Sequence, residues 1–126
     1  MGLQISIRTS GDVTILDLQG SATIGSGGEP LSRPLQKLLA DGVRNLLLNM
    51  ADLTQIDSSG VSAVVEAYVS LRRRGGGLAL LRPSGRVLLV LKVIHLLEII
   101  PNFEDEAEAL ARFQPKGYSA TPGSTG

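Results

Sequence analysis

One short stretch, Ile56–Val61, constrains the fold more than any other part of the sequence. The apolar run before it, Leu46–Met50, is too short for a helix and is typical of a buried strand. After it, apolar residues recur at helical spacing, namely at Val61, Val64, Val65, Tyr68 and Leu71. The stretch is therefore predicted to join a strand to a helix, as in α/β proteins.

Two residues at this junction, Asp57 and Ser58, are of the types that begin helices. An oxygen of either side chain could accept a hydrogen bond from a free backbone N–H group of the first turn, which is a purely structural role. A second interpretation is that the Ser58 hydroxyl accepts a phosphoryl group, which the positive end of the helix dipole and the free N–H groups would tolerate. Gly60, within the first turn, indicates that another backbone approaches closely, and a docking partner would supply one.

Composition excludes several classes of function. The 126 residues, 43% of them hydrophobic, suffice for one domain with its own core. The chain has no cysteine and only one histidine, His95, so thiol catalysis, disulfides and cysteine- or histidine-rich metal sites are excluded, and neither a metal nor a cofactor is expected. Twelve basic residues balance twelve acidic ones, which disfavours nucleic-acid binding. No apolar segment is long enough for membrane insertion, so a cytoplasmic location is expected.

Hydrophobic periodicity predicts the remaining elements. Alternation in residues 3–7 and 13–18 predicts an antiparallel hairpin that ends at Gly20 and is followed by a polar, glycine-rich loop over residues 20–29. A helix over residues 30–41 contains Pro34, so either its first turn is distorted or it starts late, with Ser32 as cap. Further strands are predicted at residues 45–50, 78–81 and 98–103, and further helices at 58–74, 87–97 and 105–113.

Helices between the strands imply a parallel crossover from the hairpin to the strand at 45–50. The helix at 87–97 is apolar on more than one face, so it is either buried or presents apolar surface to a partner. His95 lies near its end, where a structural or surface role is expected and not a catalytic one. The arginines at 72–74 suit a helix end better than a nucleic-acid site. Residues 114–126 are predicted to form a flexible tail.

The order of these elements, with Asp57-Ser58-Ser59-Gly60 at the strand-to-helix junction, resembles the STAS family and in particular its stand-alone anti-sigma-factor antagonists. The segments at 49–53, 74–76 and 106–110 add to the resemblance. It implies an α/β fold with a mixed β-sheet, an N-terminal antiparallel hairpin and about four helices packed on the sheet. The STAS domain would cover residues 1–113.

The resemblance also implies a function, which is partner switching. The unmodified protein would bind a kinase-type anti-sigma factor, the kinase would phosphorylate Ser58 and binding would then be lost, until a phosphatase restores it. A phosphate adds about −1.5 to −2 charge beside Asp57, which opposes docking. A weak homodimer is compatible with the resemblance. The partner-binding residues would be Asp57, Ser58, Ser59, Gly60, Val61 and Ser62.

Two positions depart from the family pattern. Residues 20–23 lack the acidic side chains that many relatives carry there, and Ser62 stands where glycine is common. An alternative function is a structural or regulatory STAS subunit of a multi-protein assembly or of a lipid-transport ATPase. An enzyme is not expected, because the only histidine lies far from Ser58 in the sequence and no Gly-x-Ser-x-Gly motif is present.

Overall fold

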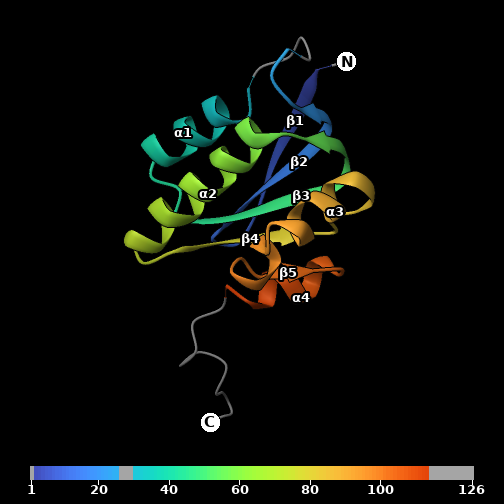
Figure 1. Ribbon diagram of the computed structural model, residues 1–126. Helices are drawn as coiled ribbons and strands as arrows, with labels where there is room; N and C mark the ends of the chain where they lie inside the picture. The colour runs from blue at the N-terminus through green and yellow to red at the C-terminus, as the bar shows by residue number, and fades with distance from the viewer. Residues whose placement is uncertain (1, 26–29, 114–126) are drawn as a thin grey trace.

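The computed structural model describes residues 2–25 and 30–113 (Figure 1). Over these residues it confirms the α/β class, with a mixed sheet, an N-terminal hairpin and helices between the later strands. The elements in chain order are β1 (Leu3–Ser10), β2 (Val13–Ala22), α1 (Ser32–Ala40), β3 (Asn45–Ile56), α2 (Ser58–Arg73), β4 (Gly77–Leu81), α3 (Gly85–Val93), the 3-10 turn η1 (Leu96–Glu98), β5 (Asn102–Phe103) and α4 (Glu106–Ala111). The predicted tail at 114–126 lies outside the described residues.

The sheet has five strands in the order β1-β2-β3-β4-β5. β1 and β2 are antiparallel and joined by a two-residue turn, in which Gly11 has a φ of 57°. A glycine at the first central position fits the type II′ turn that matches strand twist. β2, β3, β4 and β5 then run parallel to one another, which confirms the predicted crossover.

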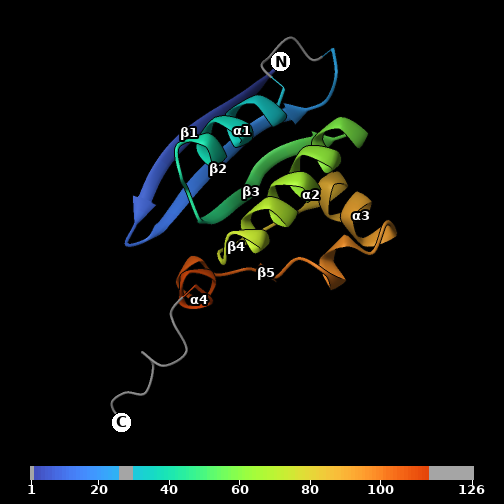
Figure 2. The ribbon, with the colours of Figure 1, turned by 90° about the vertical axis from the view of Figure 1, so that its left-hand side faces the viewer.

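Helices cover the two faces of this sheet unequally (Figures 1 and 2). The larger core joins one face to α1, α2 and α3, and strand residues such as Leu16, Leu48 and Leu80 are fully buried in it. The smaller core joins the other face to α4, around Ile15, Leu47 and Ala109. The strands β2, β3 and β4 each contribute buried side chains to both faces, which explains the apolar runs at the start of β3 and throughout β4.

Strand lengths differ from the prediction. The hairpin does not end at Gly20, because β2 continues to Ala22, and β3 continues past Met50 to Ile56. Polar residues interrupt β3, but Leu53 and Ile56 still point into the core. Register shifts between β2 and β3 accommodate the extra residues.

Three helix predictions also need correction. α1 starts late, at Ser32, but Ser32 is not its cap: Leu31 holds that position, and no side chain caps this end. α3 ends at Val93 and not at residue 97, because His95 adopts a left-handed conformation with a φ of 62°. The last helix is confined to Glu106–Ala111.

Candidate functional site

The predicted junction is formed by the end of β3 and the start of α2. Asp57 holds the N-cap position with an extended backbone. Its Oδ1 accepts hydrogen bonds from the backbone N–H groups of Ser59 at 3.0 Å and Gly60 at 3.3 Å. Of the two residues that could cap the helix, Asp57 therefore does so, and Ser58 becomes the first residue of the helix.

The same carboxylate also holds the segment that follows β2. Its Oδ2 accepts a hydrogen bond from the backbone N–H of Ile24 at 2.9 Å. The backbone N–H of Asp57 donates to the carbonyl oxygen of Ala22 at 3.2 Å. Asp57 thus joins two segments that are distant in sequence, and it places the largely exposed side chain of Ile24 beside the helix start.

These hydrogen bonds lower the pKa of Asp57. The largest cause is the Ser59 hydroxyl, which donates to Oδ1 at 2.6 Å, and the backbone N–H of Ile24 follows. All of these donors favour the ionised carboxylate. A fixed negative charge therefore lies immediately before Ser58.

The two serines of the junction differ in exposure and in bonding. Ser58 is exposed, and within the described residues its hydroxyl takes part in none of the hydrogen bonds. Ser59 is half-buried, and its hydroxyl is bound to Asp57. Ser58 is therefore the serine whose oxygen is available for modification. Two of the expected free N–H groups are not available, however, since Asp57 already binds those of Ser59 and Gly60.

Gly60 is buried, and the backbone that approaches it belongs to the chain itself. A Cβ atom at this position would lie 2.8 Å from the carbonyl oxygen of Ala22 and 2.7 Å from Cγ1 of Ile56. The interpretation that Gly60 makes room for a partner's backbone is wrong. Because Gly60 has no side chain, the first turn of α2 can pack against Ala22 at the end of β2. This contact keeps Asp57 close enough to bind the backbone N–H of Ile24.

The other two predicted contact residues, Ser62 and Val61, differ in how exposed their side chains are. Ser62 is exposed and lies one helical turn after Ser58, so the two serines share one face of α2. Val61 is half-buried and packs against the larger core. Ser58 and Ser62 are thus the parts of the predicted set that a partner can reach most directly.

Exposed apolar side chains add to this surface. The helix α3 lies beside α2 on the same face of the sheet (Figures 1 and 2). It exposes Leu89 and Val93, which are 62% and 67% accessible. The sequence predicted that this helix is either buried or presents apolar surface, and Leu89 and Val93 do form apolar surface. The contribution of Ile24 was missed, because its segment was assigned to a polar loop.

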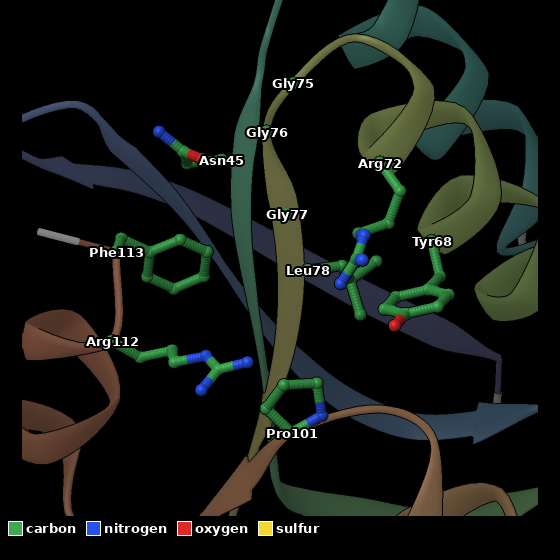
Figure 3. A pocket seen from close by; sticks show the side chains of 10 residues that line it. All are labelled: Asn45, Tyr68, Arg72, Gly75, Gly76, Gly77, Leu78, Pro101, Arg112 and Phe113. Atoms are coloured by element: carbon green, nitrogen blue, oxygen red, sulfur yellow. The ribbon is translucent and has the colours of Figure 1, made fainter. Parts of the chain in front are cut away.

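A small cavity lies at the other end of α2 (Figure 3). It measures about 220 Å³, below the roughly 300–1,000 Å³ of typical small-molecule sites. The guanidinium group of Arg72 lies 5.8 Å from the centre of the Tyr68 ring, and Arg112 points toward the same space. The cavity contains none of the residues predicted to be functional.

Within residues 2–25 and 30–113, neither the histidine nor a metal site belongs to this junction. His95 lies at the end of α3, where its Nδ1 is 2.7 Å from Oε2 of Glu98, so it is not a base for Ser58. No group of three or more histidine and carboxylate side chains in this part of the chain could hold a metal ion. Of the helices described, none has the length and apolar character needed to cross a membrane.

Comparison with known proteins gives a family and a fold. The family model of the STAS domain matches residues 4–109. A Thermotoga neapolitana protein named as a candidate anti-sigma factor antagonist is 32% identical over 78 residues, which cover 62% of this chain and 69% of that protein.

Solved structures agree with the fold. The crystal structure of a candidate anti-sigma factor antagonist from Thermotoga maritima superposes with a TM-score of 0.78 at 23% identity, and the match covers 88% of this chain and 95% of that one. The phosphorylated form of the Bacillus cell fate determinant SpoIIAA superposes with a TM-score of 0.66 at 20% identity, covering 88% of this chain and 100% of that one.

Proposed function

The chain belongs to the STAS domain family, and from this membership we propose that it is an anti-sigma factor antagonist that acts by partner switching. In its unmodified form it binds a kinase-type anti-sigma factor. That kinase phosphorylates Ser58, which releases the complex, and a phosphatase restores binding. The protein itself is regulatory and not an enzyme.

The contrast between the two serines carries this proposal. The hydroxyl of Ser58 is exposed and uncommitted among the described residues, whereas the Ser59 hydroxyl donates to Asp57 at 2.6 Å. Phosphorylation of Ser59 would break that bond and weaken the cap of α2. Phosphorylation of Ser58 would leave the junction intact.

The charge at the junction supports release after phosphorylation. Asp57 stays ionised because its hydrogen bonds lower its pKa. A phosphate on Ser58 adds about −1.5 to −2 charge beside it, and Asp57 already occupies the N–H groups of Ser59 and Gly60. The added charge is therefore poorly compensated within the chain and would have to be desolvated in any complex.

The surroundings of Ser58 fit a protein partner. Ile24 is 79% accessible and lies next to Asp57, and α3 contributes Leu89 and Val93 on the same side of the sheet. Apolar surface of this kind is commonly covered by another protein. A partner that covers Ile24 would also lie beside Asp57 and Ser58, which supports a charge switch at the interface.

The test compares two variants of Ser58 as baits in lysate from the source organism. Ser58→Ala lacks the acceptor oxygen and should retain an ATP-binding kinase, whereas Ser58→Asp should lose it, since a carboxylate supplies part of the phosphate's charge. Ser10→Ala, which removes an exposed serine hydroxyl at the hairpin turn and at the opposite end of the sheet from Ile56, is the matched control and should behave as the wild type.

Mapping of phosphorylated peptides completes the test. After incubation of the wild type with the captured kinase and ATP, the label should be on Ser58. Label on Ser59 alone, or equal retention of the kinase by both Ser58 variants, would contradict the proposal. Capture of a transporter ATPase or of a particle with several STAS proteins would favour the structural subunit instead.

A further inference from the structure

The outer edge of β1 is a second surface, and no part of the described chain pairs with this edge. In the sheet order it lies outside β2, and Figure 2 shows it at the outer margin of the molecule. All eight of its residues pair with β2 in one uninterrupted register, from Leu3 opposite Gly20 to Ser10 opposite Val13. Its other side is a regular row of backbone groups.

The hairpin turn determines which backbone groups face outward. In a two-residue hairpin the closing pair, here Ser10 and Val13, exchanges both of its hydrogen bonds. Every second residue of β1 before Ser10 then bonds to β2 in the same way. The residues between them direct their N–H and C=O groups away from the sheet; these are Leu3, Ile5, Ile7 and Thr9.

Features that usually protect an edge strand are absent from β1. It contains neither proline nor lysine, and no bulge interrupts its pairing with β2. Its single charge, Arg8, is engaged by Asp17 at 2.7 Å and by Glu106 at 2.6 Å. Ile7 is nevertheless 58% accessible. Edges of this kind are templates for pairing with another strand.

We propose that β1 pairs antiparallel with β1 of a second copy of this chain. One register uses all four outward-facing residues: Leu3 lies opposite Thr9, and Ile5 lies opposite Ile7. Each facing pair exchanges two bonds, so the four pairs give about eight hydrogen bonds between the copies. Ile7 packs against Ile5 of the second copy, and Arg8 lies opposite the neutral Gln4.

The sequence of β1 thus supplies the argument for a second copy as the occupant. This register places apolar residues against each other on one face and avoids contact between like charges on the other. A single strand pair is small beside the roughly 1,200–2,000 Å² buried in stable complexes, so association depends on protein concentration.

The pairing leaves the switch site open. β1 is separated from β3 and the start of α2 by β2. In an antiparallel dimer the two Ser58 side chains lie toward opposite ends of the joined sheet. Dimerisation and partner binding are therefore independent, and a variant that abolishes one should preserve the other.

Cysteine cross-linking tests the register directly, because the chain contains no cysteine of its own. Ser6 lies opposite its own copy, in a pair without hydrogen bonds, where side chains are closest. Ser6→Cys should form a disulfide-linked dimer under mild oxidation. Ser10→Cys is the matched control, since Ser10 is equally exposed on the same face but lies far from its own copy. Equal cross-linking of both variants, or none of either, would overturn the proposal.

Backbone variants test the hydrogen bonds. Ile7→Pro removes an outward N–H group that β2 does not use, so it should shift sedimentation at high concentration from dimer to monomer. Ile7→Lys should also shift the protein from dimer to monomer, because it adds charge to the edge strand. This variant replaces Ile7→Pro in the test if the proline variant does not fold. A thermal melt checks folding. Dimerisation that persists in a folded Ile7→Pro or Ile7→Lys variant would contradict β1 pairing.

Discussion

The two ends of α2 are built in opposite ways. At its start, one side chain, Asp57, satisfies the first turn and also binds the segment after β2. At its end, the chain leaves the helix through glycines whose backbone N–H groups donate hydrogen bonds, and the guanidinium group of Arg44 adds one bond to the carbonyl oxygen of Arg74. The N–H of Gly76 donates to Leu71 O at 2.9 Å, and the N–H of Gly77 donates to Arg44 O at 3.0 Å.

This difference separates an end of α2 that carries an exposed serine from an end that is closely packed on Arg44. A side-chain cap leaves the neighbouring Ser58 exposed, so charge can be added there without breaking the backbone. The glycine turn is fixed by backbone contacts and offers no comparable freedom.

The largest effect is expected from Gly76→Ala at the glycine turn. A Cβ atom there would overlap the carbonyl oxygen of Arg44 and lie 3.1 Å from its Cα, so backbone must move. We expect a loss of about 3 kcal/mol or more in the free energy of unfolding, at the upper end for overpacking. Chemical denaturation measures it.

Gly77→Ala is the matched control for this substitution. Its added Cβ would meet only the Phe113 ring, at 3.8 Å, which is an ordinary contact. The change should therefore be close to neutral. Similar losses for the two variants would mean that close packing on Arg44 does not fix this end of α2.

Gly60→Ala should have the next largest effect, at the other end of the same helix. In an open helix this substitution would stabilise by about 1 kcal/mol. Here the added atom would lie 2.8 Å from Ala22 O and 2.7 Å from Ile56 Cγ1, so we expect a net loss of roughly 1–3 kcal/mol. A stabilised variant would contradict the close approach of β2 to α2. Ser62→Ala, an exposed change in the same helix, is the control.

The sequence predicted the junction itself but not the reason for its glycine. Apolar spacing and cap residues are local signals, so the strand-to-helix transition at Asp57 could be found from them. The group that approaches Gly60 belongs to Ala22, in another strand, and no local pattern identifies it. The contact of Asp57 with Ile24 was missed for the same reason.

The lengths of the strands were also only partly predictable from local patterns in the sequence. The hairpin was predictable because alternation and the turn glycine are both local. The extension of β3 to Ile56 was not, because polar residues break its apolar run, and pairing with β2 depends on shifts of register. The break in α3 at His95 was hidden by continuous apolar residues on both sides.

A smaller loss is expected from Asp57→Ala, of about 0.5–2 kcal/mol, the usual range for a lost cap. The pKa of Asp57 is lowered in the folded state, so its contribution is present above the ordinary pKa of about 3.9 and is lost as pH falls through the lower folded value. The loss from the substitution should therefore shrink in acid, as melts at several pH values would show. A loss that is independent of pH would contradict the role of the charge.

The smallest effect is expected from Ser59→Ala, which removes one hydrogen bond at an accessible site and should cost no more than about 1 kcal/mol. Its sharper consequence is electrostatic. The Ser59 hydroxyl is the largest cause of the lowered pKa of Asp57, so the pKa should rise toward its ordinary value, which NMR titration of the carboxyl carbon would detect.

The same variant also compares the two serines functionally. Because the hydroxyl of Ser59 binds Asp57 and that of Ser58 is uncommitted among the described residues, Ser59→Ala should raise the pKa of Asp57 and still be phosphorylated. Ser58→Ala should do the reverse, leaving that pKa unchanged and losing the label. A Ser59→Ala variant that is no longer phosphorylated, with α2 intact by circular dichroism, would assign the acceptor to Ser59. The exposed and the bound serine would then have exchanged the roles that their geometry gives them.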